Sequence, residues 1–194
     1  YSLGISQASN LILGSELSES FSTASDKTKS NFKTWIQGDY NDSNYFEDLD
    51  QCLNDFSADK PEFDYKITND DDALYIYTSG TTGNPKAAKI SHKRLRLMML
   101  GFKGAVQPNK NDRVYNVLPL YHSAGGVIAV GLALTSGASL VLKRKFSVNE
   151  FWDDVHKYKV TIFQYIGELC RYLLNAPYHK HEKDHNLRVV SGNG

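Results

Sequence analysis

Thr78-Ser79-Gly80-Thr81-Thr82-Gly83-Asn84-Pro85-Lys86 is the most informative stretch of the sequence. The apolar residues before it, 73–77, predict a buried strand, and residues 87–90 after it predict a second short strand. The backbone N–H groups, the hydroxyls and the lysine ammonium of the stretch are all able to donate to phosphate oxygens. Its two glycines allow the backbone to approach a ligand closely. The stretch therefore predicts a phosphate-binding loop between two strands.

The loop differs from the two common nucleotide-binding patterns. Two residues rather than four separate Gly80 from Gly83, and Ala87 follows the lysine, so the G-x-x-x-x-G-K-[ST] pattern is absent. The G-x-G-x-x-G dinucleotide fingerprint does not occur in the loop either. A polar hairpin turn without a ligand is the alternative interpretation of a segment rich in serine, threonine and glycine.

The order of residues in the loop resembles the signature loop of the adenylate-forming superfamily, which comprises acyl-CoA synthetases, luciferases and peptide-synthetase adenylation domains. In that family the loop closes over the phosphates of ATP while a carboxylate attacks the α-phosphate. The resemblance implies that Lys86 and Thr81 take part in catalysis and that Thr81 is a candidate for Mg²⁺ held through ATP. It implies that the cofactor is bound by the following residues of the loop: Thr78, Ser79, Gly80, Thr81, Thr82, Gly83 and Lys86.

A second informative stretch is Pro119-Leu120-Tyr121-His122-Ser123-Ala124-Gly125-Gly126. By itself, His122 is a lone histidine near the end of a predicted strand, and such a residue is often a core or capping histidine. In the adenylate-forming family, however, this position lines the pocket of the acyl-adenylate. The resemblance implies that His122 contacts the substrate and donates a hydrogen bond to charge that develops during the reaction, whereas Tyr121 packs.

A third stretch, residues 163–174, combines a predicted strand with an amphipathic helix. Together with residues 191–194 it is similar to the fatty-acid transport proteins, also called very-long-chain acyl-CoA synthetases. Across the superfamily this strand end borders the acyl tunnel, so the resemblance implies that Tyr165, Ile166 and Gly167 line the acyl pocket. The family's backbone cups the adenine at positions that match Gly192, Asn193 and Gly194.

The alternation of predicted elements defines the expected fold. Strands separated by helices require crossover connections and favour an α/β fold with a mostly parallel sheet, here as part of the large N-terminal domain of an adenylate-forming enzyme. We expect an N-terminal α/β portion with an acidic linker over 1–72 and an AMP-binding core over 73–194. The resemblance implies that the small C-terminal domain with the catalytic lysine is absent from this sequence. The predicted strands cover residues 10–14, 32–36, 73–77, 87–90, 113–118, 138–142, 160–165 and 187–190.

Several finer expectations follow from local patterns. Apolar residues at helical spacing predict an amphipathic helix over 45–56. A basic helix is expected over 91–100, and a capping box formed by Ser147 and Glu150 is expected to begin a later helix. Because ligands of parallel α/β sheets bind beyond the carboxyl ends of the strands, we expect the phosphate loop, His122, Gly167 and Gly192 just after strands at that edge.

Composition narrows the function classes. With 22 basic and 22 acidic residues the net charge is zero, so the sequence does not indicate a nucleic-acid partner. Two distant cysteines, Cys52 and Cys170, fit a reducing compartment and inert thiols. The apolar segment 125–142 contains glycines and hydroxyl residues and predicts a buried helix, a turn and a strand rather than a membrane span. We expect an intracellular protein without a signal peptide.

Two polar segments invite comparison with metal sites. The acidic run 69–72 places adjacent side chains in different directions, which favours a solvated loop. His179, His181 and His185 lie among lysines in a second polar segment, and nearby positive charge opposes the binding of a cation. We therefore expect no metal ion in either segment.

These observations converge on one expected function. The resemblance implies a long-chain or very-long-chain fatty acid–CoA ligase that uses ATP, Mg²⁺ and coenzyme A. Because the sequence begins at Tyr1 rather than at methionine, we expect it to be an inactive internal piece of a longer protein. That protein could associate with the endoplasmic reticulum, the peroxisome or the plasma membrane through other regions. Two alternatives stay open: a fatty-acid uptake protein with coupled activation, and a ligase for another carboxylate such as a bulky sterol-type acid.

Overall fold

The computed structural model describes residues 2–23, 32–40, 46–78 and 83–193. The chain divides into two compact units. The first unit contains Tyr1–Lys66 and Tyr77–Ala87, and the second contains Ile67–Ile76 and Ala88–Gly194.

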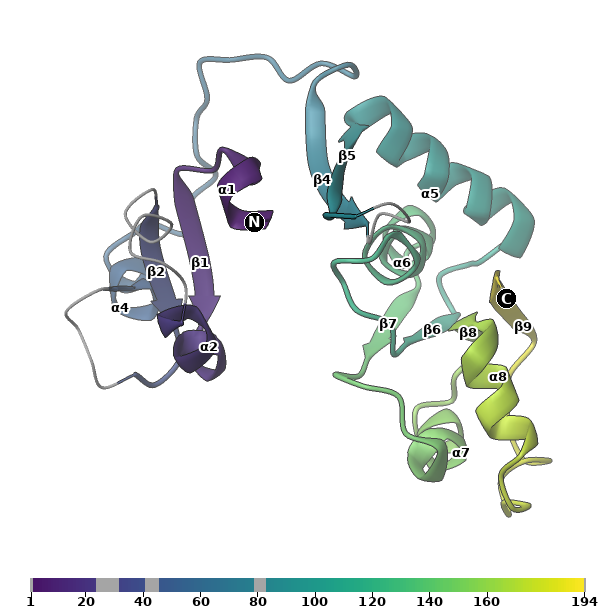
Figure 1. Ribbon diagram of the computed structural model, residues 1–194. Helices are drawn as coiled ribbons and strands as arrows, with labels where there is room; N and C mark the ends of the chain where they lie inside the picture. Colours follow the sequence, from purple (N-terminus) through teal and green to yellow (C-terminus); the bar gives the residue numbers. More distant parts are fainter. Residues whose placement is uncertain (1, 24–31, 41–45, 79–82, 194) are drawn as a thin grey trace. The chain divides into compact units, whose positions relative to one another are not determined.

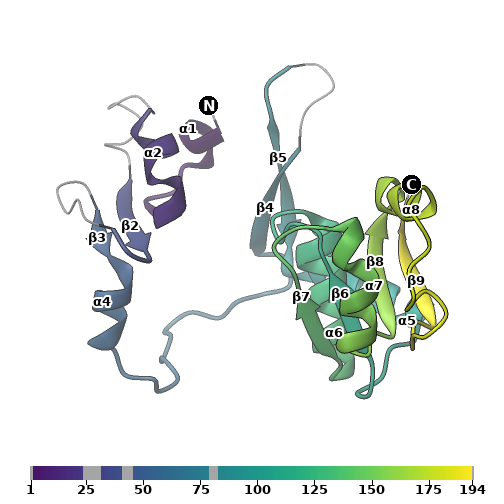
Figure 2. The ribbon, with the colours of Figure 1, turned by 90° about the horizontal axis from the view of Figure 1, so that it is seen from below.

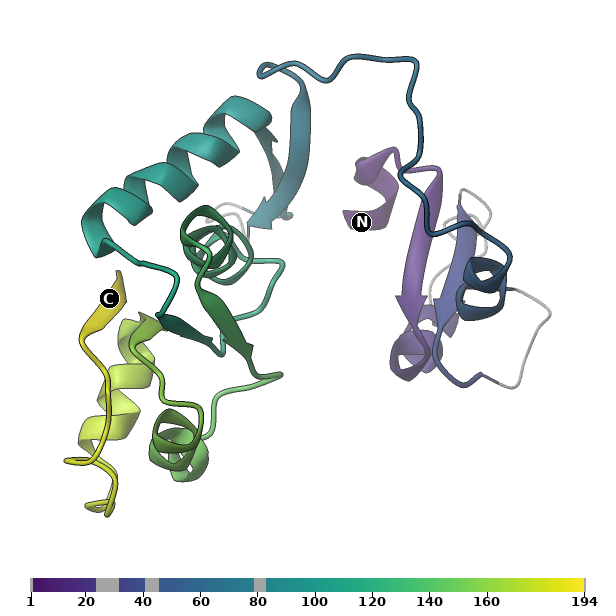
Figure 3. The ribbon, with the colours of Figure 1, turned by 180° about the vertical axis from the view of Figure 1, so that it is seen from behind.

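The first unit contains a small parallel sheet of order β1-β2-β3 (Figure 3). Leu13 and Ile36 lie on its two longer strands and are buried together with Phe21. The strands predicted over 10–14 and 32–36 are confirmed, the second with a shift of one residue. The elements of this unit are α1 (Ser2–Ser6), β1 (Asn10–Gly14), η1 (Ser15–Leu17), α2 (Ser18–Ser22), β2 (Lys33–Gln37), β3 (Glu47–Asp48) and α4 (Leu49–Asn54).

The helix predicted over 45–56 is shorter than its apolar pattern indicated. Residues 47 and 48 pair with β2 as β3, which leaves only six residues for α4. The carboxylate of Asp48 fixes the start of the helix, since it accepts a hydrogen bond from the Gln51 N–H at 2.9 Å. The predicted helix range 45–56 begins at Tyr45, which lies outside the described residues.

The strands predicted on either side of the phosphate loop exist as β4 (Asp72–Thr78) and β5 (Lys86–Ser91). They form a separate two-stranded sheet, as Figure 2 shows. The prediction that 73–77 is buried is wrong, because Leu74 is 36% and Tyr75 50% exposed. The apolar run belongs to a thin ribbon rather than to the middle of the large sheet, so the loop does not follow a strand of that sheet.

The second unit is built on a four-stranded sheet of order β7-β6-β8-β9 in which every pair is parallel. This confirms the expected α/β class with a mostly parallel sheet and crossover helices. The strands are β6 (Arg113–Asn116), β7 (Ser139–Leu142), β8 (Ile162–Ile166) and β9 (Val189–Asn193). The helices are α5 (His92–Val106), the π-helix η2 (Ser123–Ala129), α6 (Val130–Ser136), α7 (Val148–Lys157) and α8 (Gly167–Leu174).

Both faces of this sheet are covered by helices (Figure 1). Residues alternate between the faces along each strand. Tyr115 and Phe163 pack against α7 and α8, whereas Val114 and Ile162 pack against α5, η2 and α6. Coverage of both faces is the usual arrangement for a parallel sheet.

Several helix ends differ from their predictions. Helix α5 continues beyond residue 100 to Val106 and begins after Ser91, whose hydroxyl accepts a hydrogen bond from the Arg94 N–H. Ser147 occupies the N-cap of α7 but makes no side-chain cap hydrogen bond, so the predicted capping box is wrong. Glu150 instead forms an ion pair with Lys143 at 3.2 Å.

An ion pair between the buried Asp112 and the exposed Arg188 joins the starts of the strands at the edge opposite to their carboxyl ends. The Arg188 guanidinium donates to both carboxylate oxygens of Asp112, at 2.9 and 2.6 Å. The Thr161 hydroxyl and the Asn109 N–H also donate to Asp112. These hydrogen bonds, that of Arg188 above all, lower the pKa of Asp112 to about 2. The network ties together the segments that lead into β6, β8 and β9.

Candidate functional site

The described part of the phosphate loop consists of its two ends. The Thr78 hydroxyl donates to the Lys86 carbonyl oxygen at 3.5 Å, which links the last residue of β4 to the first residue of β5. Gly83 has a φ of +138°, a conformation that a side chain would strain. Lys86 is exposed. The predicted contacts Ser79, Gly80, Thr81 and Thr82 lie outside the described residues.

His122 occupies the N-cap position of η2. Its N–H donates to the Pro119 carbonyl oxygen at 3.1 Å, and its own carbonyl oxygen accepts from the Gly126 N–H at 2.8 Å. These two hydrogen bonds fix the backbone on either side of the histidine. The imidazole itself is exposed, with its centroid 4.7 Å from that of the Tyr121 ring.

Two glycines allow η2 to lie against the segment that leads to His122. A Cβ on Gly125 would meet the carbonyl oxygens of Leu118 and Pro119, and a Cβ on Gly126 would overlap the carbonyl oxygen of Leu120. Backbone atoms cannot move aside as a flexible side chain can. The glycine pair is therefore needed for the close approach that places His122.

Asn116 is a positioning residue that sequence reasoning missed. Its side chain is fully buried at the end of β6, where its Oδ1 accepts from the Leu118 N–H at 3.1 Å and its Nδ2 donates to the Gly125 carbonyl oxygen at 3.3 Å. One amide thus joins the turn before His122 to the helix after it. The available signal was a polar residue at the end of an apolar strand, just ahead of a proline.

The predicted acyl and adenine residues are neighbours across the β8–β9 pair. Tyr165 is in register with Gly192, and Ile166 is in register with Asn193. A Cβ on Gly192 would overlap the carbonyl oxygen of Tyr165, so this position requires glycine. Gly192 lies within β9 rather than after it, which corrects the expected position. Gly194 lies outside the described residues.

His122 and Ile166 line the same cavity of about 310 Å³. Side chains alternate between the two faces of a sheet along a strand, so Ile166 lies on the same face as Ile162. The Ile162 side chain packs against η2, and this places Ile166 on the same side of the sheet as His122. Tyr165 has the opposite parity and packs against the core of α7 and α8. Gly167 is the partly buried first residue of α8. The other residues that line the cavity are Leu118, Pro119, Ser123 and Ala124.

A second hollow, of about 370 Å³, also includes His122. Its walls are mainly apolar and come from β4, α5 and η2, with Leu74, Leu95, Met99 and Val127 among them. The exposed imidazole therefore lies where two hollows of the second unit meet.

A row of buried polar side chains runs beneath η2. Asn116 is in register with Gln164, and Gln164 is in register with Ser191, so the three side chains lie on one face near the carboxyl ends of neighbouring strands. Gln164 is 1% exposed, and its Oε1 has no hydrogen-bond partner among the residues that the structure describes. Buried polar groups thus lie at this edge as well as at the opposite edge, where Asp112 is found.

Comparison with known proteins identifies the family to which this chain belongs. Residues 5–194 match the family described as AMP-binding enzyme, and the chain belongs to that family. Among its relatives, it is 38% identical over its whole length to long-chain fatty acid transport protein 1 of Rattus norvegicus and 40% identical to that of Homo sapiens. It is 52% identical over 64% of its length to long-chain fatty acid transport protein 3 of Mus musculus. The predicted resemblance to the fatty-acid transport branch is confirmed.

The chain spans 30% of the length of the first two relatives and 18% of the third. Its fold is similar to the inhibitor-bound N-terminal domain of FACL13 from Mycobacterium tuberculosis, with a TM-score of 0.83 and 22% identity over 100% of this chain and 46% of that one. It is also similar to ATP-bound MatB from Rhodopseudomonas palustris, with a TM-score of 0.78 and 20% identity over 99% of this chain and 36% of that one. These two likenesses confirm the fold.

Among the described residues, no helix has both the length and the apolar character that a membrane crossing requires.

Proposed function

We propose that this chain provides the nucleotide-binding and acyl-binding part of an AMP-forming long-chain or very-long-chain fatty acid–CoA ligase. The observation that carries the proposal is the carboxyl edge of β8 and β9. There Ile166 shares a cavity with His122, and the residues matched to the adenine-binding backbone lie alongside in register. Family membership and similarity to long-chain fatty acid transport proteins support the same function.

The proposed reaction has two steps. A carboxylate oxygen of the fatty acid attacks the α-phosphorus of ATP, and pyrophosphate leaves. The sulfur of coenzyme A then attacks the acyl carbonyl carbon, the thiol proton is lost, and AMP leaves. Positioning and neutralisation of charge dominate catalysis of phosphoryl-type substitution. Mg²⁺ held through ATP would neutralise phosphate charge, with Thr81 as the candidate contact.

The roles of the phosphate loop follow from its chemistry. Hydroxyls and backbone N–H groups donate to phosphate oxygens, and Lys86 adds a charge-assisted hydrogen bond. Lys86 is exposed at the start of β5, where its ammonium is accessible to a ligand. The proposed phosphate contacts are Thr78, Ser79, Gly80, Thr81, Thr82, Gly83 and Lys86.

The remaining proposed roles belong to the second unit. His122 donates a hydrogen bond to charge that develops at the reacting carboxylate. Ile166 contacts the acyl chain through the cavity that it shares with His122, and Tyr165 and Gly167 border this region. The backbone of Gly192, Asn193 and Gly194 contacts the adenine.

A substrate panel tests the function. The complete protein is incubated with ATP, Mg²⁺ and coenzyme A, and AMP release is measured for fatty acids from medium to very long chain. We expect turnover to rise with chain length. Turnover with a bulky sterol-type acid and none with any fatty acid would overturn the substrate but keep the reaction.

A second candidate function is fatty-acid uptake with coupled activation, which the names of the relatives favour. Uptake of labelled fatty acid by cells discriminates between the two. If uptake depends on activation, the Lys86→Ala variant loses both fatty-acid uptake and ligase activity. If transport is independent of activation, the variant loses ligase activity and retains uptake.

A further inference from the structure

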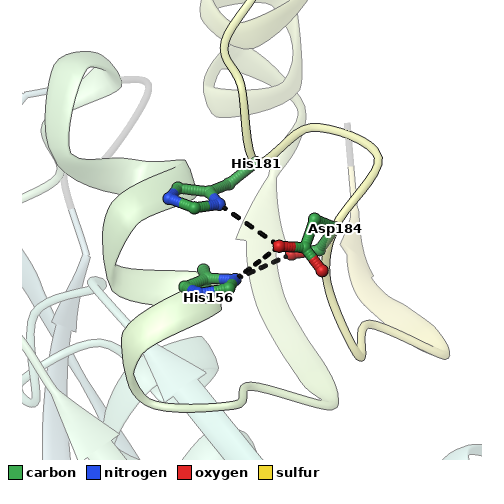
Figure 4. A group of neighbouring side chains, drawn as sticks. All are labelled: His156, His181 and Asp184. Atoms are coloured by element: carbon green, nitrogen blue, oxygen red, sulfur yellow. Dashed lines mark hydrogen bonds and ion pairs between the residues drawn. The ribbon is translucent and has the colours of Figure 1, made fainter.

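Three potential metal ligands meet at the surface of the second unit, away from the edge described above. They are His156, His181 and Asp184, shown in Figure 4. The Nδ1 atom of His156 lies 3.3 Å from Oδ2 of Asp184, and the Nδ1 atom of His181 lies 3.6 Å from the same oxygen. The two imidazole rings stack with centroids 3.9 Å apart. One nitrogen of each histidine thus lies within 3.6 Å of the same carboxylate oxygen.

The fold brings these residues together from two segments. His156 lies in the last turn of α7, and the other two lie in the connection between α8 and β9. A turn in which the Asp184 N–H donates to the His181 carbonyl oxygen at 3.1 Å holds the loop residues near each other. The carbonyl oxygen of Asp184 lies 3.0 Å from Nδ1 of His156, which joins the loop to the helix.

We infer that these three side chains form a binding site for a divalent transition-metal ion of the Zn²⁺ class. Zinc binds imidazole nitrogen and carboxylate oxygen at about 2.0–2.2 Å in tetrahedral geometry, so its ligand atoms lie roughly 3.3–3.6 Å apart. The two nitrogen–oxygen separations of 3.3 and 3.6 Å fall in that range. Water would complete the fourth position. A donor set of two imidazoles and a carboxylate suits zinc better than calcium or magnesium, which prefer oxygen.

Binding requires one change of tautomer. A carbonyl oxygen only accepts hydrogen bonds, so the metal-free chain carries a proton on Nδ1 of His156, where that nitrogen donates to the Asp184 carbonyl. The neutral tautomer with its proton on Nε2 frees Nδ1 for the metal. The two rings stack at an interplanar angle of 16°, so their nitrogen lone pairs run nearly parallel, and binding also requires one imidazole to rotate towards the ion.

The surroundings of the site favour a cation. Asp153 lies within 3.8 Å of Nε2 of His181, on the far side of the ring from the site, where a carboxylate typically orients a metal-bound histidine. The lysines of this segment, Lys180 and Lys183, are exposed, so their charge is screened by solvent. These lysines were the reason why the sequence predicted no metal ion in this segment. His156, the proposed ligand on α7, lies outside that segment.

A bound ion would fasten the loop to α7. Both segments line an apolar cavity of about 470 Å³ between α7, α8 and the loop, with Trp152, Leu173, Tyr178 and Leu187 among its walls. Occupancy of the metal site would therefore stiffen one wall of that cavity.

Calorimetric titration of the purified, metal-free protein with Zn²⁺ tests the site. We expect one saturable equivalent, a raised melting temperature, and protection of residues 175–188 from limited proteolysis. We expect His181→Ala and Asp184→Asn each to weaken the affinity for Zn²⁺ at least about tenfold. Loss of a residue that only orients a metal ligand already weakens metal affinity by about tenfold or more, and loss of a ligand should cost no less. His185→Ala is the matched control, because His185 lies in the same loop and stacks on Trp152 without belonging to the three ligands.

Asp184→Asn preserves shape, and the exposed position of Asp184 makes it the variant least able to disturb folding, so it provides the test even if the histidine variant does not fold. Absence of saturable binding would overturn the inference. Equal binding by wild type and both ligand variants, or an equal loss in His185→Ala, would also overturn it, since either result indicates non-specific binding to surface histidines.

Discussion

At the scale of single residues, Asn116 determines where His122 can lie. The amide makes two hydrogen bonds from a fully buried position, one to the turn before the histidine and one to the helix after it. Gly125 and Gly126 supply the space in which these hydrogen bonds form. The position of the exposed histidine therefore depends on Asn116 and Gly125, which are buried, and on Gly126, which is partly buried.

The Asn116→Ala variant should lose about 1–3 kcal/mol of unfolding free energy, because the Leu118 N–H and the Gly125 carbonyl would lose their partners. Urea unfolding measures this loss. In the complete protein, adenylation should fall further than stability explains, since the turn that carries His122 would loosen. Asn149→Ala, at an exposed position of α7, is the control. Full adenylation by a folded Asn116→Ala protein would contradict the positioning role.

At the scale of elements, the sequence predicts the strands of the large sheet. It predicts only in part which strands are buried and how the helix ends are capped. Short apolar runs between helical segments gave β6, β7, β8 and β9 within a few residues. The same kind of run at 73–77 is an exposed ribbon, because burial depends on which strands pair and not on the run itself. The predicted capping box failed for a similar reason, since Glu150 found Lys143 instead.

The Asp112–Arg188 pair predicts how stability depends on pH. The pKa of Asp112 is lowered to about 2 from a model-peptide value near 4, so the pair stabilises the fold fully above about pH 4 and loses this contribution as the pH falls towards 2. The shift corresponds to about 2 kcal/mol. We expect the stability difference between wild type and Asp112→Asn to narrow below about pH 4.

Thermal unfolding between pH 7 and pH 3 measures this difference, with Asp70→Asn at an exposed position as the control. If the stability difference between wild type and Asp112→Asn stays constant down to pH 3, Asp112 contributes through packing rather than through its charge.

At the scale of the whole molecule, the sequence proposes candidate site residues but not the buried residues that position them. The resemblance supplied the phosphate loop, His122 and the β8–β9 edge, because short motifs carry those positions. Asn116 and Gln164 were missed, because a single buried polar residue leaves little trace in one sequence. The contact between His156 and Asp184 joins residues 28 apart, and only tertiary structure reveals such a pair.

We propose that the loop 78–86 binds the phosphates of ATP during adenylation. The most direct measurement is fatty-acid-dependent ATP–pyrophosphate exchange by the complete protein with Lys86→Ala or Thr81→Ala. Loss of one charge-assisted phosphate contact should cost roughly 1.5–3 kcal/mol, about 10-fold to 150-fold in rate. Lys89→Ala, three residues along β5 and paired with Asp72, should retain the wild-type rate. Unchanged exchange in both loop variants would contradict the account.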